Sequence, residues 1–260
     1  LSESQLRDSA PAIWQRLNDR DRPEREVNLD PRVRSRWWLF RRSNEQLREA
    51  TAGLSRFIVT CETAKHRTFT FLSRESRPEH KLVVLAHDDS FLLGCVSSVP
   101  HLIWATAAGA TLEDRPVYVK STCFERFPFP HEDTGLTPAL TDRIRALAEQ
   151  LDAHRKTQQA AHADLTLTGM YNVLQKLRFG EALNAKDKLI HGQGLVSVLK
   201  SLHDELDAAV LAAYGWADLQ PALADHAHAD ARAAAVETLL ERLVALNARR
   251  AAEEAAGTVR

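Results

Sequence analysis

The sequence predicts an α+β fold in which a mixed α/β domain is followed by an all-α helical domain. β-Branched and aromatic runs typical of strands are concentrated in residues 56–86. From residue 136 onward, apolar residues recur at helical spacing in an Ala-rich background. Charge divides in a similar way: residues 1–130 carry 20 basic and 17 acidic side chains, or +3, and the remainder carries 14 and 18, or −4. We therefore expect an N-terminal helix and linker over residues 1–30, the mixed domain over 31–133 and the helical domain over 134–260.

The N-terminal part is predicted to begin with an amphipathic helix over residues 4–20, because its apolar side chains recur at helical spacing. Residues 21–30 are charged and contain Pro23, so we expect an exposed connector. The unbroken apolar run Trp37–Phe40 suits a short buried segment rather than an amphipathic helix.

The mixed domain is predicted to contain three strands. Ser43 or Asn44 first caps a helix that ends near Ala52. The strands then fall within residues 56–62, 68–72 and 82–86. Asp89 follows the third strand as the cap of an apolar helix, which Pro100 should kink or break. Residues 111–130 contain three prolines and are expected to be irregular with short strands.

The helical domain is predicted to begin at Thr137-Pro138, with proline in the first turn where its missing N–H is not needed. The first helix runs to about Leu165, and further helices fit residues 171–179, 196–214 and 231–254.

The cysteines and the apolar runs point to a cytoplasmic protein that is not inserted in a membrane. Cys61, Cys95 and Cys123 are far apart and odd in number, which favours reduced thiols, and the first two lie in apolar runs that suggest core positions. No apolar run approaches the roughly 18 to 20 residues of a membrane helix.

The sequence contains no convincing active site or metal site. It lacks a Gly-rich phosphate loop, a Cys-x-x-Cys pair and a His-Glu-x-x-His motif. His226 and His228 would diverge on a helix and are expected to be surface residues. We therefore predict no catalytic residues and no metal in this chain.

Six short motifs occur in order along the chain. They are Trp37-Trp38-x-Phe-Arg-Arg, Arg56-Phe57-Ile58-Val59-Thr60, Gly94-x-x-Ser97-Ser98-x-x-His101 with Trp104, Lys120 to Phe127-Pro128-Phe129-Pro130, Leu167-Thr168-Gly169-Met170-Tyr171 and Leu202-His203-x-x-Leu206-Asp207. Each motif is weakly specific, but in this order they resemble the MmeI-like (type IIL) restriction–modification enzymes and their stand-alone methyltransferase relatives. The resemblance implies the target-recognition domain and the helical domain of an S-adenosylmethionine-dependent DNA N6-adenine methyltransferase.

The resemblance also implies that the catalytic half lies outside this chain. The Asn-Pro-Pro-[Tyr/Phe] motif of that half is absent, since Tyr171-Asn172 is followed by Val173. We therefore expect no cofactor in this fragment, S-adenosylmethionine in the parent enzyme, and two partners: double-stranded DNA and the missing methyltransferase domain. Restriction–modification or a related phage defence is the expected setting.

The candidate DNA-binding residues are basic or polar side chains in predicted loops. Those expected to contact phosphates or bases are Arg41, Arg42, Lys65, His66, Arg67, Glu113, Arg115, Tyr118, Lys120 and Ser121. Arg41 and Arg42 could instead stack on the Trp37 cluster, and Glu113 could pair with Arg115 on the surface.

Two further alternatives stay open at this point. The basic residues Lys176, Arg178, Lys186 and Lys188 could clamp the DNA backbone or form a solvated face. The whole chain could also be a protein–protein interaction scaffold without a DNA-reading role.

Overall fold

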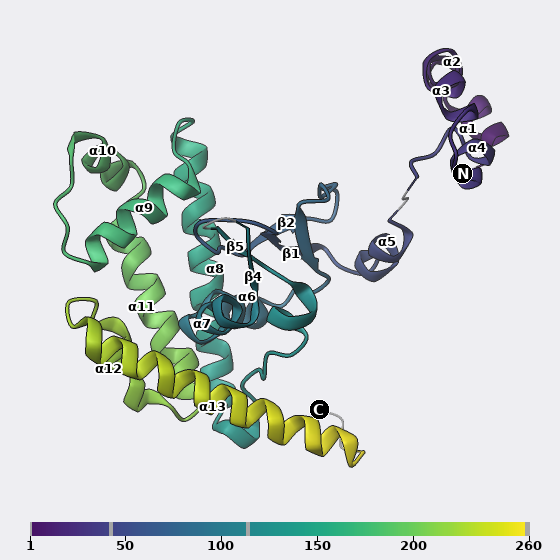
Figure 1. Ribbon diagram of the computed structural model, residues 1–260. Coiled ribbons are helices and arrows are strands. Elements are labelled where there is room, and N and C mark those ends of the chain that lie inside the picture. The colour runs from purple at the N-terminus through teal and green to yellow at the C-terminus, as the bar shows by residue number, and fades with distance from the viewer. Residues whose placement is uncertain (1, 42–43, 113–114, 258–260) are drawn as a thin grey trace. The chain divides into compact units, whose positions relative to one another are not determined.

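The computed structural model describes residues 2–41, 44–112 and 115–257. Contacts divide the chain into two compact units, Leu1–Ala52 and Gly53–Arg260. The described residues of the first unit contain helices and no strand, and the second unit combines two small sheets with the remaining helices (Figure 1). The predicted α+β class with a helical region is thus confirmed.

The first unit contains five short helices: α1 (Glu3–Ser9), α2 (Pro11–Arg20), α3 (Arg22–Glu26), α4 (Pro31–Ser35) and α5 (Glu45–Thr51). The predicted helix over 4–20 is divided at Ala10, because Pro11 begins a new helix rather than continuing the first. The predicted connector is wrong over part of its length, since α3 occupies it and accepts Pro23 in its first turn.

The apolar run that starts at Trp37 is only partly buried. Trp37 is 4% exposed, and the Arg22 guanidinium lies over its ring at 5.1 Å from the centroid. Arg25 donates to the carbonyls of Trp37, at 2.9 Å, and of Leu39. Phe40, in contrast, is 82% exposed, so the prediction of a fully buried segment is wrong at its end.

The main sheet of the second unit has three antiparallel strands in the order β2-β1-β3. They are β1 (Arg56–Cys61), β2 (Thr70–Ser73) and β3 (Leu82–Leu85). β1 is central and buried on both faces from Phe57 to Thr60, which explains its lack of alternation. Cys61 ends this strand and is exposed, so its predicted core position is wrong, whereas Cys95 is buried as predicted.

Two apolar helices, α6 (Ser90–Ser97) and α7 (Val99–Ala108), follow the sheet. Asp89 caps α6 by accepting from the Phe91 N–H at 2.8 Å, and the predicted break occurs at Ser98, two residues before Pro100. In the described part of the chain no single helix has the length and apolar character to cross a membrane. Taken together, α6 and α7 are long and apolar enough, but they are bent by 62° at the break between them.

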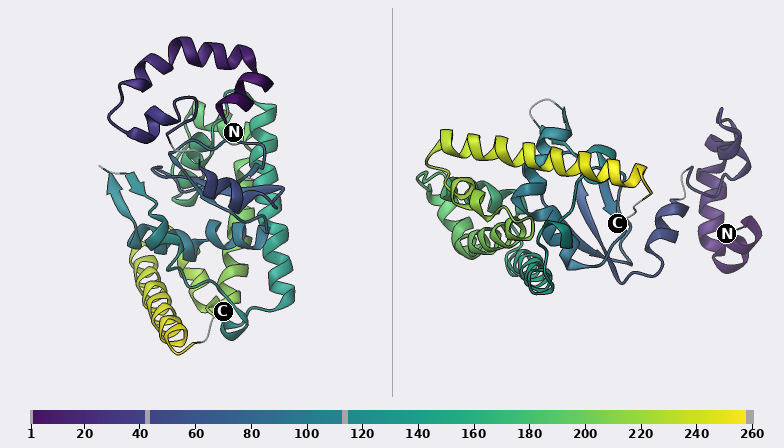
Figure 2. Two further views of the ribbon diagram at one scale, coloured as in Figure 1. Left: turned by 90° about the vertical axis from the view of Figure 1, so that its right-hand side faces the viewer. Right: turned by 90° about the horizontal axis from the view of Figure 1, so that it is seen from below.

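The segment after α7 is irregular with short strands, as predicted. β4 (Ala110–Leu112) and β5 (Arg115–Val117) form an antiparallel hairpin, and a π-helical turn covers Lys120–Phe124. The hairpin strands extend outward from the body of the second unit (Figure 2).

The C-terminal region consists of helices α8 (Pro138–Ala161), α9 (Leu167–Arg178), α10 (Ala185–Gln193), α11 (Val196–Ala213), α12 (Gln220–Ala224) and α13 (Ala229–Ala255). The four predicted helices correspond to α8, α9, α11 and α13. The sequence pattern missed α10 and α12, because both are short.

Helix α8 joins the sheet region to the helical region, so the predicted boundary at residues 133/134 does not separate compact units. Ile144 and Leu151 of α8 belong to the helical core, whereas Ala148 packs in the core beneath the sheet. Gly94 of α6 lies so close that an added Cβ would be 2.5 Å from Ile144 Cγ2. Helices on both sides of the predicted boundary therefore share one core.

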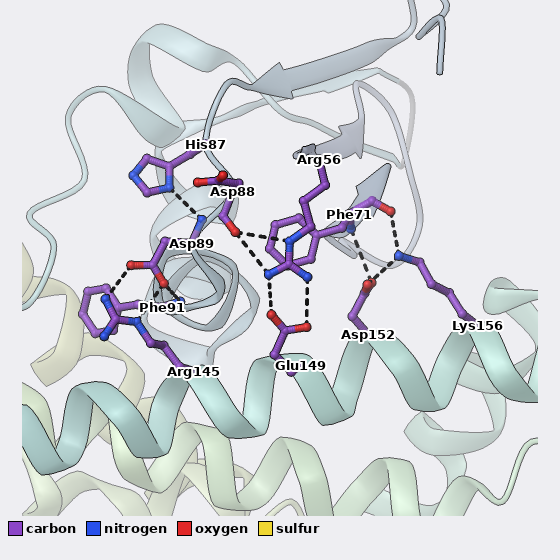
Figure 3. Close-up of polar contacts among 10 residues, drawn as sticks. All are labelled: Arg56, Phe71, His87, Asp88, Asp89, Phe91, Arg145, Glu149, Asp152 and Lys156. Carbon is purple, nitrogen blue, oxygen red and sulfur yellow. Dashed lines mark hydrogen bonds and ion pairs between the residues drawn. The ribbon is translucent and has the colours of Figure 1, made fainter. Parts of the chain in front are cut away.

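Polar contacts reinforce this junction (Figure 3). Arg56 of β1 pairs with Glu149 of α8, with one bond of 3.0 Å, and its guanidinium lies 3.7 Å from the centroid of the Phe71 ring. Arg145 of α8 pairs with Asp89 at 2.7 Å, and the Arg145 guanidinium lowers the pKa of that carboxyl. The sheet is thus fixed against α8 by charged pairs as well as by apolar packing.

Candidate nucleic-acid interface

The loop between β1 and β2 (residues 62–69) contains three of the predicted DNA-binding residues, and Arg67 holds it in place. The Arg67 guanidinium donates to Thr60 Oγ1 at 3.1 Å, to the Pro116 carbonyl at 3.0 Å and to the Cys61 carbonyl. Burial lowers the pKa of Arg67. Because its donors are used inside the fold, Arg67 positions the loop against β5, and a phosphate contact would compete with these bonds.

Lys65 and His66 both contact the same side-chain oxygen of the helical region. Asn172 Oδ1 on α9 accepts from Lys65 Nζ at 2.8 Å and lies 2.8 Å from His66 Nε2. Burial lowers the pKa of His66, which favours the neutral ring as donor to Asn172. Lys65 is exposed, so its ammonium group is available to a ligand at the surface.

The β4–β5 hairpin is attached to the same loop. The Tyr118 N–H donates to the Glu62 carbonyl at 2.7 Å, and Thr63 forms a β-bridge with Val117. Leu112 is 54% exposed, and Arg115 also lies at the surface. The base of the hairpin is therefore anchored, while Leu112 and Arg115 face solvent.

Tyr118 does not fit the predicted base contact. Its side chain is 2% exposed, and its hydroxyl lies 2.9 Å from His101 Nε2. Phe69 packs edge-on against both rings, with centroids 5.4 Å from Tyr118 and 5.6 Å from His101. Burial raises the pKa of Tyr118 and lowers that of His101 to about 3. Tyr118 is therefore part of the core beneath the hairpin.

The remaining predicted residues lie in different places. Lys120 and Ser121 are exposed in the π-helical turn, where Lys120 pairs with Glu125 at 2.9 Å. Arg41 is exposed in the first unit and pairs with Asp30 at 3.1 Å. Such surface pairs contribute about 0–1 kcal/mol, so they would exchange readily for phosphate. Arg42 and Glu113 lie outside the described residues.

A buried polar chain links the helical region to the end of the β1–β2 loop. His203 Nε2 of α11 lies 2.8 Å from the Tyr171 hydroxyl of α9, which accepts from Arg155 at 3.1 Å. Arg155, on α8 and 2% exposed, also donates to the Phe69 carbonyl at 2.7 Å. Asp152 lies 3.6 Å from the same guanidinium. The helical region thereby fixes the position at which the loop enters β2.

A hollow beside the β1–β2 loop brings together residues that the sequence gave no reason to place near one another. It has a volume of about 220 Å³ and is lined by loop residues, by Pro116 of β5 and by Arg178 and Asp207 of the helical region. Burial raises the pKa of Asp207 to about 7, although its carboxylate accepts from the Val99 N–H at 2.7 Å. His203 and Asp207 were noted in the sequence only as parts of a motif.

The described residues contain no cluster of three or more His, Cys, Asp or Glu side chains that could hold a metal ion. His228 pairs with Asp225 at 2.6 Å instead. The arrangement provides loops, a hairpin and basic side chains that can bind a ligand.

Comparisons with known proteins give one informative match. No protein-family profile matches the chain, and no curated protein matches it. Among solved structures, the type IIL restriction–modification enzyme MmeI in complex with DNA matches 95% of this chain with a TM-score of 0.61 and 16% sequence identity. The chain spans 28% of the length of that enzyme. The second unit and the N-terminal helices therefore share the fold of a region of a DNA restriction–modification enzyme.

Proposed function

We propose that this chain is the DNA-sequence-recognition module of a DNA N6-adenine methyltransferase in a restriction–modification or related phage-defence system of the cytoplasm. Methyl transfer would be carried out by a domain outside these residues. The observation that carries the proposal is the fold shared over 95% of the chain with an enzyme solved on DNA. The order of the sequence motifs supports the same assignment.

The anchored hairpin supports a DNA-reading role for this module. Side chains on a two-stranded ribbon can enter the major groove and read base edges there. Arg115 on β5 is positioned for such a contact, because an arginine can bond both acceptors of a guanine. Lys65, Lys120 and Ser121 are exposed near the base of the hairpin and suit phosphate contacts that hold the register.

S-adenosylmethionine would be held elsewhere in the parent enzyme. The role assigned to these residues is to bind the duplex and select the site, and the target base would be flipped out into the catalytic domain.

Fluorescence anisotropy of the 260-residue chain on a mixed-sequence duplex pool, across about 50–200 mM salt, tests the proposal. Affinity should fall steeply with salt, and Lys120→Gln should make the logarithmic slope shallower by about 0.9. Arg143→Gln is the matched control, because it removes an equal charge from the exposed surface of α8, where Arg143 pairs with Glu205. Binding without salt dependence, or none at low salt, would favour the scaffold alternative.

In the full-length enzyme, an exchange of Arg115 should change the methylated sequence. Each good bidentate base contact contributes about 1–3 kcal/mol of discrimination. Sequencing of methylated sites in parent and variant measures this directly. An unchanged site would remove Arg115 from the reading surface while leaving DNA binding itself untouched.

A further inference from the structure

A second hollow, in the helical region, gathers positive charge that the fold leaves largely unneutralised. It has a volume of about 280 Å³ and lies where the end of α9 meets the segment before α13. The Phe179 and His226 rings are in contact there, with centroids 5.1 Å apart. The hollow is lined by cationic and aromatic side chains that include Lys65, His66, Arg178, Phe179, His226 and Arg232.

Arg232 has no anionic partner in the part of the chain that the structure describes. Its Nε–H is buried and donates to no acceptor there, and it forms no ion pair with a described carboxylate. Burial and the charge of Arg178 both lower the pKa of Arg232. Two neighbouring guanidinium groups repel each other, and an anion between them offsets that repulsion.

Arg178 and His226 line the same hollow. Arg178 lies 3.6 Å from Asp204 and 3.9 Å from Asp207, near the limit of an ion pair, and its Nε has no partner among the described residues. His226 Nδ1 is likewise buried and unpartnered there. Burial and then Arg232 lower the pKa of His226 to about 4, so its ring is neutral and retains one N–H donor.

We propose that Arg178, Arg232 and His226 bind a backbone phosphate of the DNA that the hairpin reads. This inference rests on the proposed function and extends the contact into the helical region. Guanidinium groups match phosphate geometry because two parallel N–H groups can bond two oxygens. A phosphate in the hollow would offset the repulsion between the two arginines, which lowers the pKa of Arg232.

The position of the hollow supports DNA as the source of the phosphate. Lys65 and Arg178 line it and also line the hollow of about 220 Å³ that reaches Pro116 of β5. A basic path therefore connects the hairpin with Arg232. The sequence suggested a clamp at Lys176, Arg178, Lys186 and Lys188, but Lys176 is paired with Asp187 at 2.7 Å. Arg178 is the member of that set that lines this hollow.

Arg232→Gln and Arg242→Gln form a matched pair for the test. Both residues are on α13, and each change removes one positive charge, but Arg242 pairs with Asp218 at 2.7 Å and does not line the hollow. Binding of a mixed-sequence duplex of about 20 base pairs is measured by anisotropy over about 50–200 mM salt. The logarithmic slope should become shallower by about 0.9 in Arg232→Gln and stay near the parent value in Arg242→Gln.

The outcomes separate this inference from the function on which it rests. Equal slopes for the two variants, with the parent chain still binding DNA, overturn the phosphate contact alone. A parent chain that does not bind DNA overturns the proposed function and this inference together. The other source of phosphate is the free ion. It is tested by comparing the midpoint of thermal unfolding in inorganic phosphate with the midpoint in sodium chloride at equal ionic strength. Stabilisation by phosphate that Arg232→Gln abolishes, together with equal DNA slopes, would assign the site to a free phosphate and overturn the DNA contact.

Discussion

Replacement of Arg155 by methionine should destabilise the second unit strongly, because this guanidinium is the centre of the buried polar chain. Arg155 is 2% exposed and donates to the Phe69 carbonyl at 2.7 Å and to the Tyr171 hydroxyl at 3.1 Å. A hydrogen bond from a charged donor contributes about 1.5–3 kcal/mol, so the two bonds together account for about 3–6 kcal/mol. Asp152, 3.6 Å from the same guanidinium, keeps Lys156 as a partner at 2.5 Å, so the loss of Arg155 does not leave this carboxylate unpaired.

Because Asp152 stays paired, the expected cost lies in the lower part of this range, at about 3–5 kcal/mol. Each kcal/mol lowers the midpoint of thermal unfolding by about 2–4 °C in a domain of this size, so Arg155→Met should lower it by about 6–20 °C. Circular dichroism melts of the chain measure this shift. Lys156→Met is the control on the next residue, because Lys156 pairs with the same Asp152 from a half-exposed position and should cost about 1 kcal/mol or less. A shift below about 2 °C for Arg155→Met would refute the structural role assigned to the buried chain.

Two further predictions concern packing and pH. Gly94→Ala should lower the free energy of unfolding in urea by about 1–3 kcal/mol, because its Cβ would lie 2.5 Å from Ile144 Cγ2. Gly53→Ala is the control, because a Cβ there has open space and should be near neutral. Equal effects of the two substitutions would contradict the close packing at Gly94. The pKa of Asp207 is raised to about 7, so its contribution to stability is complete below about pH 4 and is lost as pH rises to 7. The free energy of unfolding of Asp207→Asn should therefore rise by about 1–3 kcal/mol relative to that of the parent between pH 5 and pH 7.5. A difference that does not change with pH would show that this carboxyl does not titrate in that range.

Sequence patterns predicted the elements of this fold better than the partners of its side chains. Pro100 and the apolar run around it predicted the break between α6 and α7, because a proline's missing N–H acts locally. Cys61 was placed in the core because β1 is apolar, but it lies at the exposed end of the strand. The burial of Tyr118 depends on Phe69 and His101, which come from other segments. No local pattern contains such contacts.

The same limit applies to the candidate interface. The resemblance led to Lys65, Arg115 and Lys120, which the structure places at the surface. It gave no reason to join Arg178 with Arg232, which are far apart in the sequence and line one hollow in the folded chain. A bias toward basic residues indicates a DNA surface, but only the fold decides which basic side chains line one hollow.

Under the proposed function, the division between anchored and exposed residues indicates how a new DNA specificity could arise on this scaffold. The loop beside the hairpin is fixed by Arg67 at β5 and by Asn172 at α9, and Arg155 fixes its exit into β2. Exposed residues of the hairpin, such as Thr111 and Arg115, lie beyond these anchors. Exposed substitutions usually change stability by less than about 0.5 kcal/mol, whereas loss of a buried charged anchor costs about 3–5 kcal/mol. Base-reading positions can therefore vary while the anchors stay fixed, provided that the helical region remains packed against the sheet through α8.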